Sequence, residues 1–337
     1  MQCRYQAALA LVIVLSITVD RSFAGELEAA CLEAEKKGVA FLAANQHATG
    51  VFTTHQWRTL DPTRKRTVDT PFTASQVLYS LTFCGDDPTA RAVSERAAGY
   101  LVENREAPGV WRYQGKNGWI SPDVDDTSMA WVALKRHGQS IPSEALGALR
   151  DSRNRARLFN TWIGDPSTWK GIDSRNIDAV VNLNALLFFG LNRENFDEVC
   201  RYVITQAESD KFRQGSPYYP SPLAFTHAFS RAYAEGGVSC LEKAVPKIRA
   251  AALELQQKDG GWGDDFETAV GLLTLLNLGE KGEGVERALK VVVARQMSDG
   301  GWALAPAYSG AVGRWRYGSR SVNTALFVEA LAKYRTR

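Results

Sequence analysis

The segment Gln256–Trp262 reads QQKDGGW, and Gln296–Trp302 repeats it as QMSDGGW. A related segment near the beginning of the chain, Gln46–Phe52, keeps the glutamine, the first glycine and an aromatic last residue. Each segment precedes an apolar stretch long enough to form a helix. Self-similarity of this kind is typical of proteins built from stacked copies of one supersecondary unit.

A turn followed by a helix start recurs about every 50 residues, in six copies. The turns lie at residues 50–52, 109–111, 167–169, 215–218, 260–262 and 300–302. The helix expected after each turn carries a polar residue near its first turn, at Thr73, Thr127, Asn182, Thr226, Thr268 and Thr324. We call this position the Thr/Asn column.

Two kinds of helix alternate along the copies. Segments before the turns, such as Glu26–Gln46 and Val285–Gln296, repeat apolar residues every three or four positions, which places one stripe of a helix against a core. Segments after the turns, such as Ala179–Leu191 and Thr268–Leu278, are apolar almost all round. No stretch alternates as a β-strand would. The pattern predicts an all-α fold, an (α/α)6 barrel or toroid of six helical hairpins with an inner and an outer layer.

Two motifs resemble those of a known family. The Gln-x-x-x-Gly-x-Trp segments are similar to the Gln-Trp repeats of squalene and oxidosqualene cyclases, and residues 123–127, DVDDT, resemble the D-x-D-D-T acid motif of squalene–hopene cyclases and class II diterpene cyclases. The resemblance covers nearly all of residues 25–337 and implies a terpenoid cyclase/protein prenyltransferase-like toroid. Family cyclases usually enclose the substrate between two helical domains, whereas this chain has the length of one.

The repeat distinguishes the three acids of residues 123–127 from one another. Four positions before the Thr/Asn column, four of the six copies have an aspartate, which is typical of helix N-caps, so Asp123 could be a cap alone. Two positions before the column, five copies have an apolar or cyclic residue and the second copy has Asp125. Asp125 is therefore the strongest functional candidate, and Asp126 and Glu267 in the neighbouring column follow it.

Three carboxylates this close cannot all ionise cheaply, so at least one pKa is expected to rise. The start of a helix acts in the opposite direction, because it stabilises an anion. Together these effects could keep a proton on one acid while making its conjugate base tolerable. The resemblance implies that Asp125 is the general acid that protonates an alkene or epoxide, with Asp123 and Asp126 tuning it.

The implied mechanism also needs a dry aromatic cavity, since ring faces stabilise cations. The expected substrate-binding residues are Trp119, Tyr113, Tyr218, Tyr219, Phe225, His227, Phe266 and Glu267. His227 could instead be a satisfied core histidine, and Trp111, Trp262 and Trp302 are expected to be structural because they occupy the repeated turns. The expected partner is a hydrophobic isoprenoid or lipid, and the prediction includes no cofactor and no metal.

Several alternatives remain open from the residues. The toroid could be a non-catalytic binder of a lipid or a protein. A glycan-acting hydrolase or lyase would pair Asp125 with Asp264, Asp265 or Glu267, although copies two and five lie on nearly opposite sides of a six-fold ring. The clustered acids could also ligate Ca²⁺ or Mg²⁺. A zinc site like that of the protein prenyltransferase β subunit is not expected, because residues 264–266 read DDF and lack its cysteine.

The N-terminus predicts export. Arg4, an apolar run over residues 7–19 and the small residues Ser22 and Ala24 are the parts of a signal peptide, with cleavage expected after Ala24 and an uncleaved anchor as the alternative. Residues 1–24 are thus expected to be a signal peptide and residues 25–337 the toroid domain, periplasmic or secreted. The remaining cysteines, which allow three disulfide connectivities or free thiols, are Cys31, Cys84, Cys200 and Cys240.

The charge balance argues against nucleic acid as a partner. The chain has 40 Lys and Arg residues against 37 Asp and Glu residues, with no strongly basic face along the sequence. Two local basic runs, residues 64–66 and 150–157, could meet a diphosphate or the anionic head groups of a membrane surface, or form solvated loops.

Overall fold

The computed structural model describes residues 25–164, 177–310 and 313–336. The expected signal peptide of residues 1–24 and the expected third turn at residues 167–169 lie outside these residues. A first helix, whose described part covers residues 25–45, runs along the outside of the fold.

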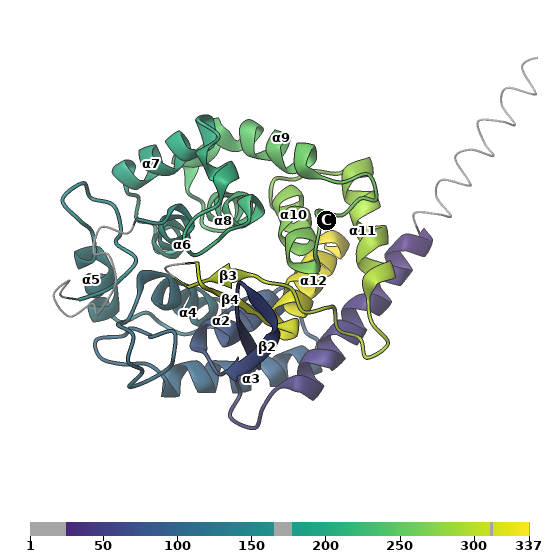
Figure 1. Ribbon diagram of the computed structural model, residues 1–337, viewed down its shortest axis with the longest axis horizontal. Coiled ribbons are helices and arrows are strands. Elements are labelled where there is room, and N and C mark those ends of the chain that lie inside the picture. The colour runs from purple at the N-terminus through teal and green to yellow at the C-terminus, as the bar shows by residue number, and fades with distance from the viewer. Residues whose placement is uncertain (1–24, 165–176, 311–312, 337) are drawn as a thin grey trace, which may run out of the picture.

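The inner layer is a closed ring of helices (Figure 1). Its members are α2 (Pro71–Leu81), α4 (Val124–Arg136), α6 (Ala179–Gly190), α8 (Pro222–Ala234), α10 (Asp265–Asn277) and α12 (Arg320–Arg335). Each helix packs against its two neighbours, and α12 packs against α2, so the ring closes. Its helices are buried on nearly every side, as the apolar sequence of α6 requires. The predicted (α/α)6 toroid is confirmed.

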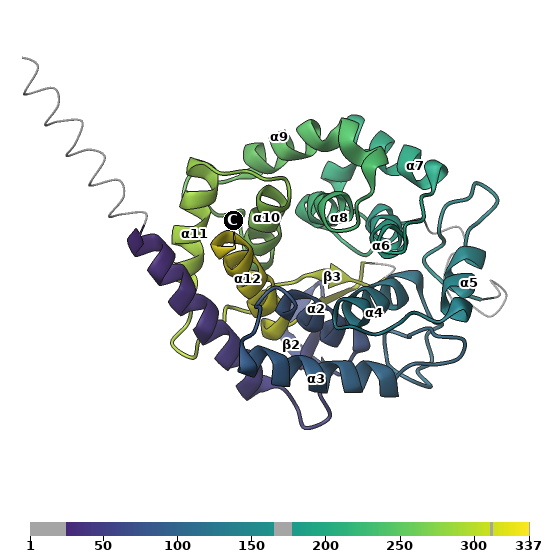
Figure 2. The same ribbon diagram turned by 180° about the vertical axis from the view of Figure 1, so that it is seen from behind.

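The outer layer surrounds this ring, as both views show (Figures 1 and 2). It consists of the first helix, α3 (Pro88–Glu103), α5 (Ser143–Asp151), α7 (Asp197–Glu208), α9 (Val245–Leu255) and α11 (Glu283–Arg295), with the short 3-10 helices η2 (Lys211–Gln214) and η3 (Ser239–Ala244). An outer helix buries one stripe: in α11 the buried residues are Val285, Ala288, Leu289 and Val292. This spacing is the one that the sequence predicted for the outer layer.

The tryptophans of three turns each tie an outer helix to the following inner helix. The indole nitrogen of Trp262 donates to the carbonyl oxygen of Ala252 in α9 at 2.7 Å, and its backbone N–H donates to Oγ1 of Thr268 in α10 at 3.1 Å. Trp111 and Trp302 make the same two kinds of hydrogen bond. The polar residue of the Thr/Asn column therefore satisfies a buried backbone donor of the turn.

The third copy uses a different aromatic residue. The backbone N–H of Phe159 donates to Oδ1 of Asn182 at 3.0 Å, and the amide of Asn182 donates back to the Phe159 carbonyl oxygen. Phe159 thus occupies the place that Trp111 and Trp262 have in their copies. The longer side chain of asparagine, with both a donor and an acceptor, explains why this copy departs from threonine.

Aspartates cap several inner helices. Asp123, Asp178 and Asp264 are the N-caps of α4, α6 and α10, and each accepts a hydrogen bond from a backbone N–H of the first turn. In α2 the cap is Thr70 and not Asp69, because Pro71 is already the first helical residue. The capping role predicted for this column therefore applies to Asp123, which does not exclude a second role for it.

A small antiparallel sheet lies across the middle of the ring (Figure 1). Its strands, in the order β2-β1-β4-β3, are β1 (Thr54–Arg58), β2 (Asp61–Val68), β3 (Tyr308–Ser309) and β4 (Trp315–Gly318). The expectation of no β-strand is wrong. β2 reads DPTRKRTV and is exposed along most of its length, so it lacks the apolar alternation that marks a half-buried strand.

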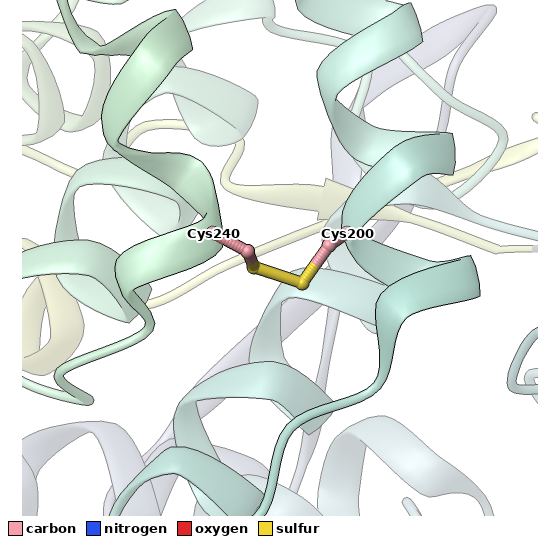
Figure 3. The surroundings of a disulfide bond; sticks show 2 residues. All are labelled: Cys200 and Cys240. Carbon is pink, nitrogen blue, oxygen red and sulfur yellow. A yellow bond between two sulfur atoms is a disulfide. The ribbon is translucent and has the colours of Figure 1, made fainter.

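One disulfide links two outer elements. Cys200 of α7 is bonded to Cys240 of η3 (Figure 3), while Cys31 and Cys84 are free and buried. The structure thereby selects one pairing from those that the sequence left open. Within the described residues, no helix has both the length and the apolar composition needed to cross a bilayer.

Candidate active site

A cavity of about 340 Å³ lies between the sheet and the N-terminal ends of inner helices. Its walls come from α2, α4, α6, β1, β3, β4 and the loops beside them. The carboxylates among its lining residues are Asp123, Asp125 and Asp126, all at the start of α4. Its size and its mainly aromatic walls are those of a small-molecule site.

Asp125 is buried, with 8% of its surface exposed, and both of its oxygens accept hydrogen bonds. The side-chain amide of Asn184 in α6 donates to Oδ1 at 2.6 Å, and the hydroxyl of Tyr219 donates to Oδ2. Burial raises the pKa of Asp125 to about 6, and the hydrogen bonds from Tyr219 and Asn184 limit this rise. The burial of Asp125 therefore moves its pKa toward neutral pH.

Asp123 and Asp126 form a coupled pair beside Asp125. The backbone N–H of Asp126 donates to Oδ1 of Asp123 at 2.6 Å. Burial raises the pKa of Asp123 to about 7, and burial together with the charge of Asp123 raises the pKa of Asp126 well above its usual range. Oδ2 of Asp126 is buried with no hydrogen-bond partner among the described residues. Burial and mutual repulsion therefore favour a proton on this acid cluster, as the spacing predicted.

Aromatic rings line the cavity above the acids. Tyr308 and Tyr317 stack with ring centroids 5.5 Å apart, and Tyr113 meets both rings edge-on. Trp162 packs edge-on against Tyr218 on another part of the lining. Such faces can stabilise a positive charge that water does not reach.

The structure gathers four of the predicted substrate-binding residues around this cavity. Tyr113, Tyr218, Tyr219 and Trp119 line it, and the Trp119 side chain stands at its mouth with 73% of its surface exposed. Of these four residues, Tyr219 contacts the acids directly, because its hydroxyl donates a hydrogen bond to Asp125.

Four predicted residues lie elsewhere. His227 and Phe266 line a second, smaller cavity of about 40 Å³ near the middle of the ring. Phe225 stacks on Phe212 with ring centroids 5.1 Å apart and borders a third cavity of about 170 Å³. The Glu267 carboxylate accepts a hydrogen bond from the hydroxyl of Ser221 at 2.9 Å and does not line the acid cavity. Their inner-helix positions predicted burial but not which cavity they face.

The second carboxylate of the glycan-acting alternative is not in the acid cavity. Asp264 caps α10, and Asp265 accepts a hydrogen bond from the backbone N–H of Ala303 and lies 3.5 Å from Arg295. Neither these two nor Glu267 is among the residues that line the cavity of Asp125. The cavity of Asp125 therefore contains no second carboxylate from the fifth copy.

The donor set does not suit a divalent cation. Between residues 25 and 336, outside the two gaps, no group of three or more His, Cys, Asp or Glu side chains is arranged to hold a metal ion. At the start of α4, Asp123 caps the helix, and Asp125 accepts two protein donors. These bonds already engage oxygens of Asp123 and Asp125, the kind of ligand that Ca²⁺ or Mg²⁺ prefers.

Two residues behind Asp125 were not predicted from the sequence. Asn184 donates to Asp125, and Arg231 of α8 donates to Oδ1 of Asn184 at 2.8 Å. A signal for Arg231 exists: five positions after the Thr/Asn column, four copies have leucine or valine, whereas the other two have Arg231 and Glu329. The cavity residues of the sheet gave no such signal, since they lie outside the helical repeat.

Known proteins resemble this chain in sequence. No family model matches the chain. Over 218 residues it is 29% identical to drimenyl diphosphate synthase of Streptomyces showdoensis, a match that covers 59% of this chain and 39% of that protein. Over 246 residues it is 24% identical to squalene–hopene cyclase of Bradyrhizobium diazoefficiens, covering 58% and 36%. The chain therefore matches well under half the length of these relatives.

Solved structures share the fold. The type II terpene cyclase MstE of Scytonema, in complex with its substrate geranylgeranyl dihydroxybenzoate, superimposes with a TM-score of 0.74 at 16% identity, covering 92% of this chain and 99% of that one. A possible member of the GH105 family from Klebsiella pneumoniae superimposes with a TM-score of 0.59 at 14% identity, covering 91% and 93%. Together with the sequence relatives, the match to MstE confirms the resemblance to the terpenoid cyclase-like superfamily.

Proposed function

We propose that this terpenoid cyclase-like chain is a class II isoprenoid cyclase in which Asp125 is the general acid. A carboxyl oxygen of Asp125 gives its proton to one carbon of an alkene, whose π electron pair forms the new C–H bond, or to the oxygen of an epoxide, whose C–O bond then breaks. A second alkene of the same molecule attacks the resulting carbocation and closes a ring. Final loss of a proton gives a product with the composition of the substrate.

Each neighbour of Asp125 contributes to this step. After the proton leaves, Asn184 and Tyr219 stabilise the carboxylate through the hydrogen bonds that they already donate. The rings of Tyr113, Tyr308 and Tyr317 face the cavity and stabilise the cation. The sheet covers the acids and keeps bulk water from the carbocation, which water would otherwise trap.

The observation that carries the proposal is the acid cluster itself. Three buried carboxylates share the floor of one aromatic cavity, although burying even one carboxylate without a charged partner is costly. A toroid that only binds a lipid has no need for buried carboxylates and would avoid this energetic cost. The arrangement is explained when one of the acids must donate a proton to an apolar ligand.

The length of the chain is compatible with this activity. The alignment with MstE covers nearly all of both chains, and MstE is a type II terpene cyclase seen in complex with its substrate geranylgeranyl dihydroxybenzoate. This alignment supports activity in a protein with one toroid, although the family usually has two helical domains. In this chain, residues of β1, β3 and β4 form part of the wall of the cavity.

Product analysis tests the proposal. The purified protein is incubated with squalene, with its 2,3-epoxide and with geranylgeranyl diphosphate, and extracts are analysed by gas chromatography and mass spectrometry, after phosphatase treatment for the diphosphate. We expect a cyclic product of unchanged composition from at least one substrate. Asp125→Asn should lower its rate of formation at least about 100-fold, the usual contribution of a general acid. Asp86→Asn, which changes an exposed aspartate, is the matched control.

Two outcomes would overturn it. In the first, the wild-type protein cyclises no substrate, and it binds isoprenoids with the same affinity as Asp125→Asn. The non-catalytic alternative is then correct. If Asp125→Asn cyclises the substrate at the wild-type rate, the acid is another residue, and Asp126 becomes the candidate.

Export belongs to the same proposal. The signal-like residues 1–24 support it, and the Cys200–Cys240 disulfide is compatible with an oxidising compartment. Expression of the full chain with a C-terminal tag, followed by cell fractionation and N-terminal sequencing, tests it. Export predicts a periplasmic or secreted protein that begins at Gly25. A cytoplasmic protein that keeps its first residues contradicts it.

We also propose that the hairpin of β1 and β2 contacts an anionic membrane surface. Leu60, in the loop between β1 and β2, has 97% of its surface exposed. The basic run at residues 64–66 in β2 is also exposed. The other basic run is different, since Arg150 pairs with Glu194 and Arg157 with Glu198. Exposed cations near an apolar tip favour anionic lipids.

Vesicle flotation tests the membrane contact. The protein should float with vesicles of phosphatidylglycerol and phosphatidylcholine, and not with phosphatidylcholine alone. Replacing residues 64–66 by serine should abolish flotation, whereas the control Arg150→Ser/Arg157→Ser should not. Equal flotation of both variants would exclude this surface.

A further inference from the structure

A buried hydrogen-bond chain reaches Asp125 from the inner helix two places further along the ring. Nη2 of Arg231 in α8 lies 2.8 Å from Oδ1 of Asn184 in α6, and Nδ2 of Asn184 lies 2.6 Å from Oδ1 of Asp125 in α4. Exposed fractions of the three residues are 3%, 2% and 8%. Three inner helices are thus linked by side chains that water hardly reaches.

The chemistry of the guanidinium group fixes the direction of this chain. An amide side chain can present either its oxygen or its NH₂ group to a neighbour, but a guanidinium group only donates. The Asn184 oxygen must therefore face Arg231, and its NH₂ group must face Asp125. Without Arg231, the amide could turn over and accept a hydrogen bond from a protonated Asp125.

We propose that Arg231 is a positioning residue for the reaction: by holding the Asn184 amide in one orientation, it prevents Asp125 from donating its proton to Asn184 and leaves that proton facing the cavity. The inference rests on the proposed function for its catalytic consequence. The orientation itself can be tested without any substrate.

Tyr219 completes the arrangement. Its hydroxyl donates to Oδ2 of Asp125, so each oxygen of the carboxyl group already accepts one hydrogen bond from the protein. A proton on Asp125 must then use a remaining lone pair, and Asp125 lines the acid cavity. The same two donors stabilise the carboxylate once the proton has moved to the ligand.

Packing alone does not explain a charged residue at position 231. Nε and Nη1 of Arg231 are buried without a hydrogen-bond partner among the described residues, and its guanidinium carbon lies 5.1 Å from the ring centre of Tyr79. Four of the six copies have leucine or valine at the same place in the repeat. A buried cation without a carboxylate in contact is costly, so a structural role alone would favour an aliphatic residue.

A small cavity adjoins the unpartnered side of the guanidinium group. It measures about 40 Å³ and is lined by Arg231, Asn184, His227 and Gln76, among others. This volume can hold ordered water, which would satisfy Nε, Nη1 and the unpartnered Nε2 of His227. Asn184 and the amide orientation do not depend on that water.

Charged groups around the chain determine what removal of Arg231 does to Asp125. Asp123 and Asp126 lie on the same helix as Asp125, Asp178 caps α6, and Tyr219 precedes α8. Around Arg231 itself are His227 and Glu235 on the α8 side and the pair Glu329 and Lys333 in α12. Against this background, Arg231 lowers the pKa of Asp125 by its charge. Its loss should raise that pKa, and a reversed Asn184 amide should raise it further.

The first experiment measures the Asp125 carboxyl group in the protein without substrate. Its C=O stretching band is followed by infrared spectroscopy on protein labelled with ¹³C-aspartate, assigned by its absence in Asp125→Asn, and titrated with pH. We expect the midpoint of Arg231→Met to rise by about one pH unit or more. Arg231→Lys keeps a charged group that only donates, so its midpoint should stay near that of the wild type.

The second experiment measures turnover. In Arg231→Met, kcat should fall at least about tenfold with little change in KM, because the proton is then donated to Asn184 while the cavity is unchanged. The alkaline limb of the pH profile should move upward with the infrared midpoint. Arg231→Lys should recover most of the activity.

The outcomes separate the two proposals. An Arg231→Met midpoint equal to that of the wild type overturns the positioning role. A midpoint that rises more for Arg231→Met than for the same substitution in an Asn184→Ala background, where only the loss of charge acts, supports the positioning role, and an equal rise in both backgrounds overturns it. If a protein with the larger rise cyclises nothing, the positioning role stands and the proposed function is contradicted. If Arg231→Met does not fold, Arg231→Gln replaces it: glutamine can accept from Asn184, so the midpoint should again rise, and an unchanged midpoint again overturns the inference.

Discussion

Nε2 of Gln296 donates a hydrogen bond to the carbonyl oxygen of Ala34 at 2.8 Å, across 262 positions of sequence. The same nitrogen donates to the carbonyl oxygen of Gly300 in its own turn at 2.9 Å. Gln256 makes the corresponding pair of bonds to Gly260 and Gly284. One glutamine therefore ties a turn to the next outer helix, and Gln296 makes this junction between the last copy and the first.

Gln296→Ala should destabilise the fold by about 1–3 kcal/mol, because two partly buried carbonyl oxygens lose their donor. The measurement is urea unfolding followed by circular dichroism. Gln257→Ala, at the exposed glutamine that follows Gln256, is the matched control and should change the free energy of unfolding by less than about 0.5 kcal/mol. Equal effects of the two substitutions would show that the ring closes without Gln296.

The repeat made the architecture predictable, because each of its positions has one physical task. Trp262 and Thr268 form hydrogen bonds between a turn and its inner helix, and the same tasks recur in other copies. Departure from a repeated position then marked Asp125 within α4. The sequence could not show that Asn184 and Tyr219 meet this carboxylate, since they come from other copies and are joined to it by the closed ring.

The cavity residues that belong to the sheet could not be predicted from the sequence, for a different reason. Tyr308 and Tyr317 face the acids from strands that lie between helical elements and have no equivalent in other copies. β2 is polar on both sides, so no periodicity indicated it. The sequence could predict that inner-helix residues such as Phe225 are buried, but not that Phe225 would stack on Phe212, away from the acids.

The reaction should slow as the pH rises above about 6. Asp125 must carry its proton to act, and its pKa lies at about 6, so the protonated fraction falls tenfold for each further pH unit. The profile of kcat/KM against pH should therefore show an alkaline limb of slope −1. A limb displaced well above pH 7 would instead assign the proton to Asp126, whose pKa is raised further.

Loss of the Cys200–Cys240 disulfide should lower stability by about 2–4 kcal/mol, since it closes a loop of 40 residues in the unfolded chain. The double variant Cys200→Ser/Cys240→Ser should unfold at lower urea concentration. Alkylation under denaturing conditions checks the pairing: Cys31 and Cys84 should react without a reductant, and Cys200 and Cys240 only after reduction. Reaction of all four without reduction would exclude the disulfide.

Asp126→Asn should stabilise the protein at pH 8 and have little effect on stability at pH 4. The pKa of Asp126 is raised in the folded state, so the folded protein retains a proton that the unfolded chain releases. The associated stability is fully present below the unfolded pKa of about 4 and is lost as the pH rises toward the folded pKa. Asparagine does not ionise, so the variant escapes that loss, and its Tm advantage should grow between pH 4 and 8. Asp86→Asn, at an exposed carboxylate, should show no such growth. An Asp126→Asn difference in Tm that is constant over this range would mean that Asp126 ionises equally in the folded and unfolded states, and the acid cluster would then hold no extra proton through Asp126.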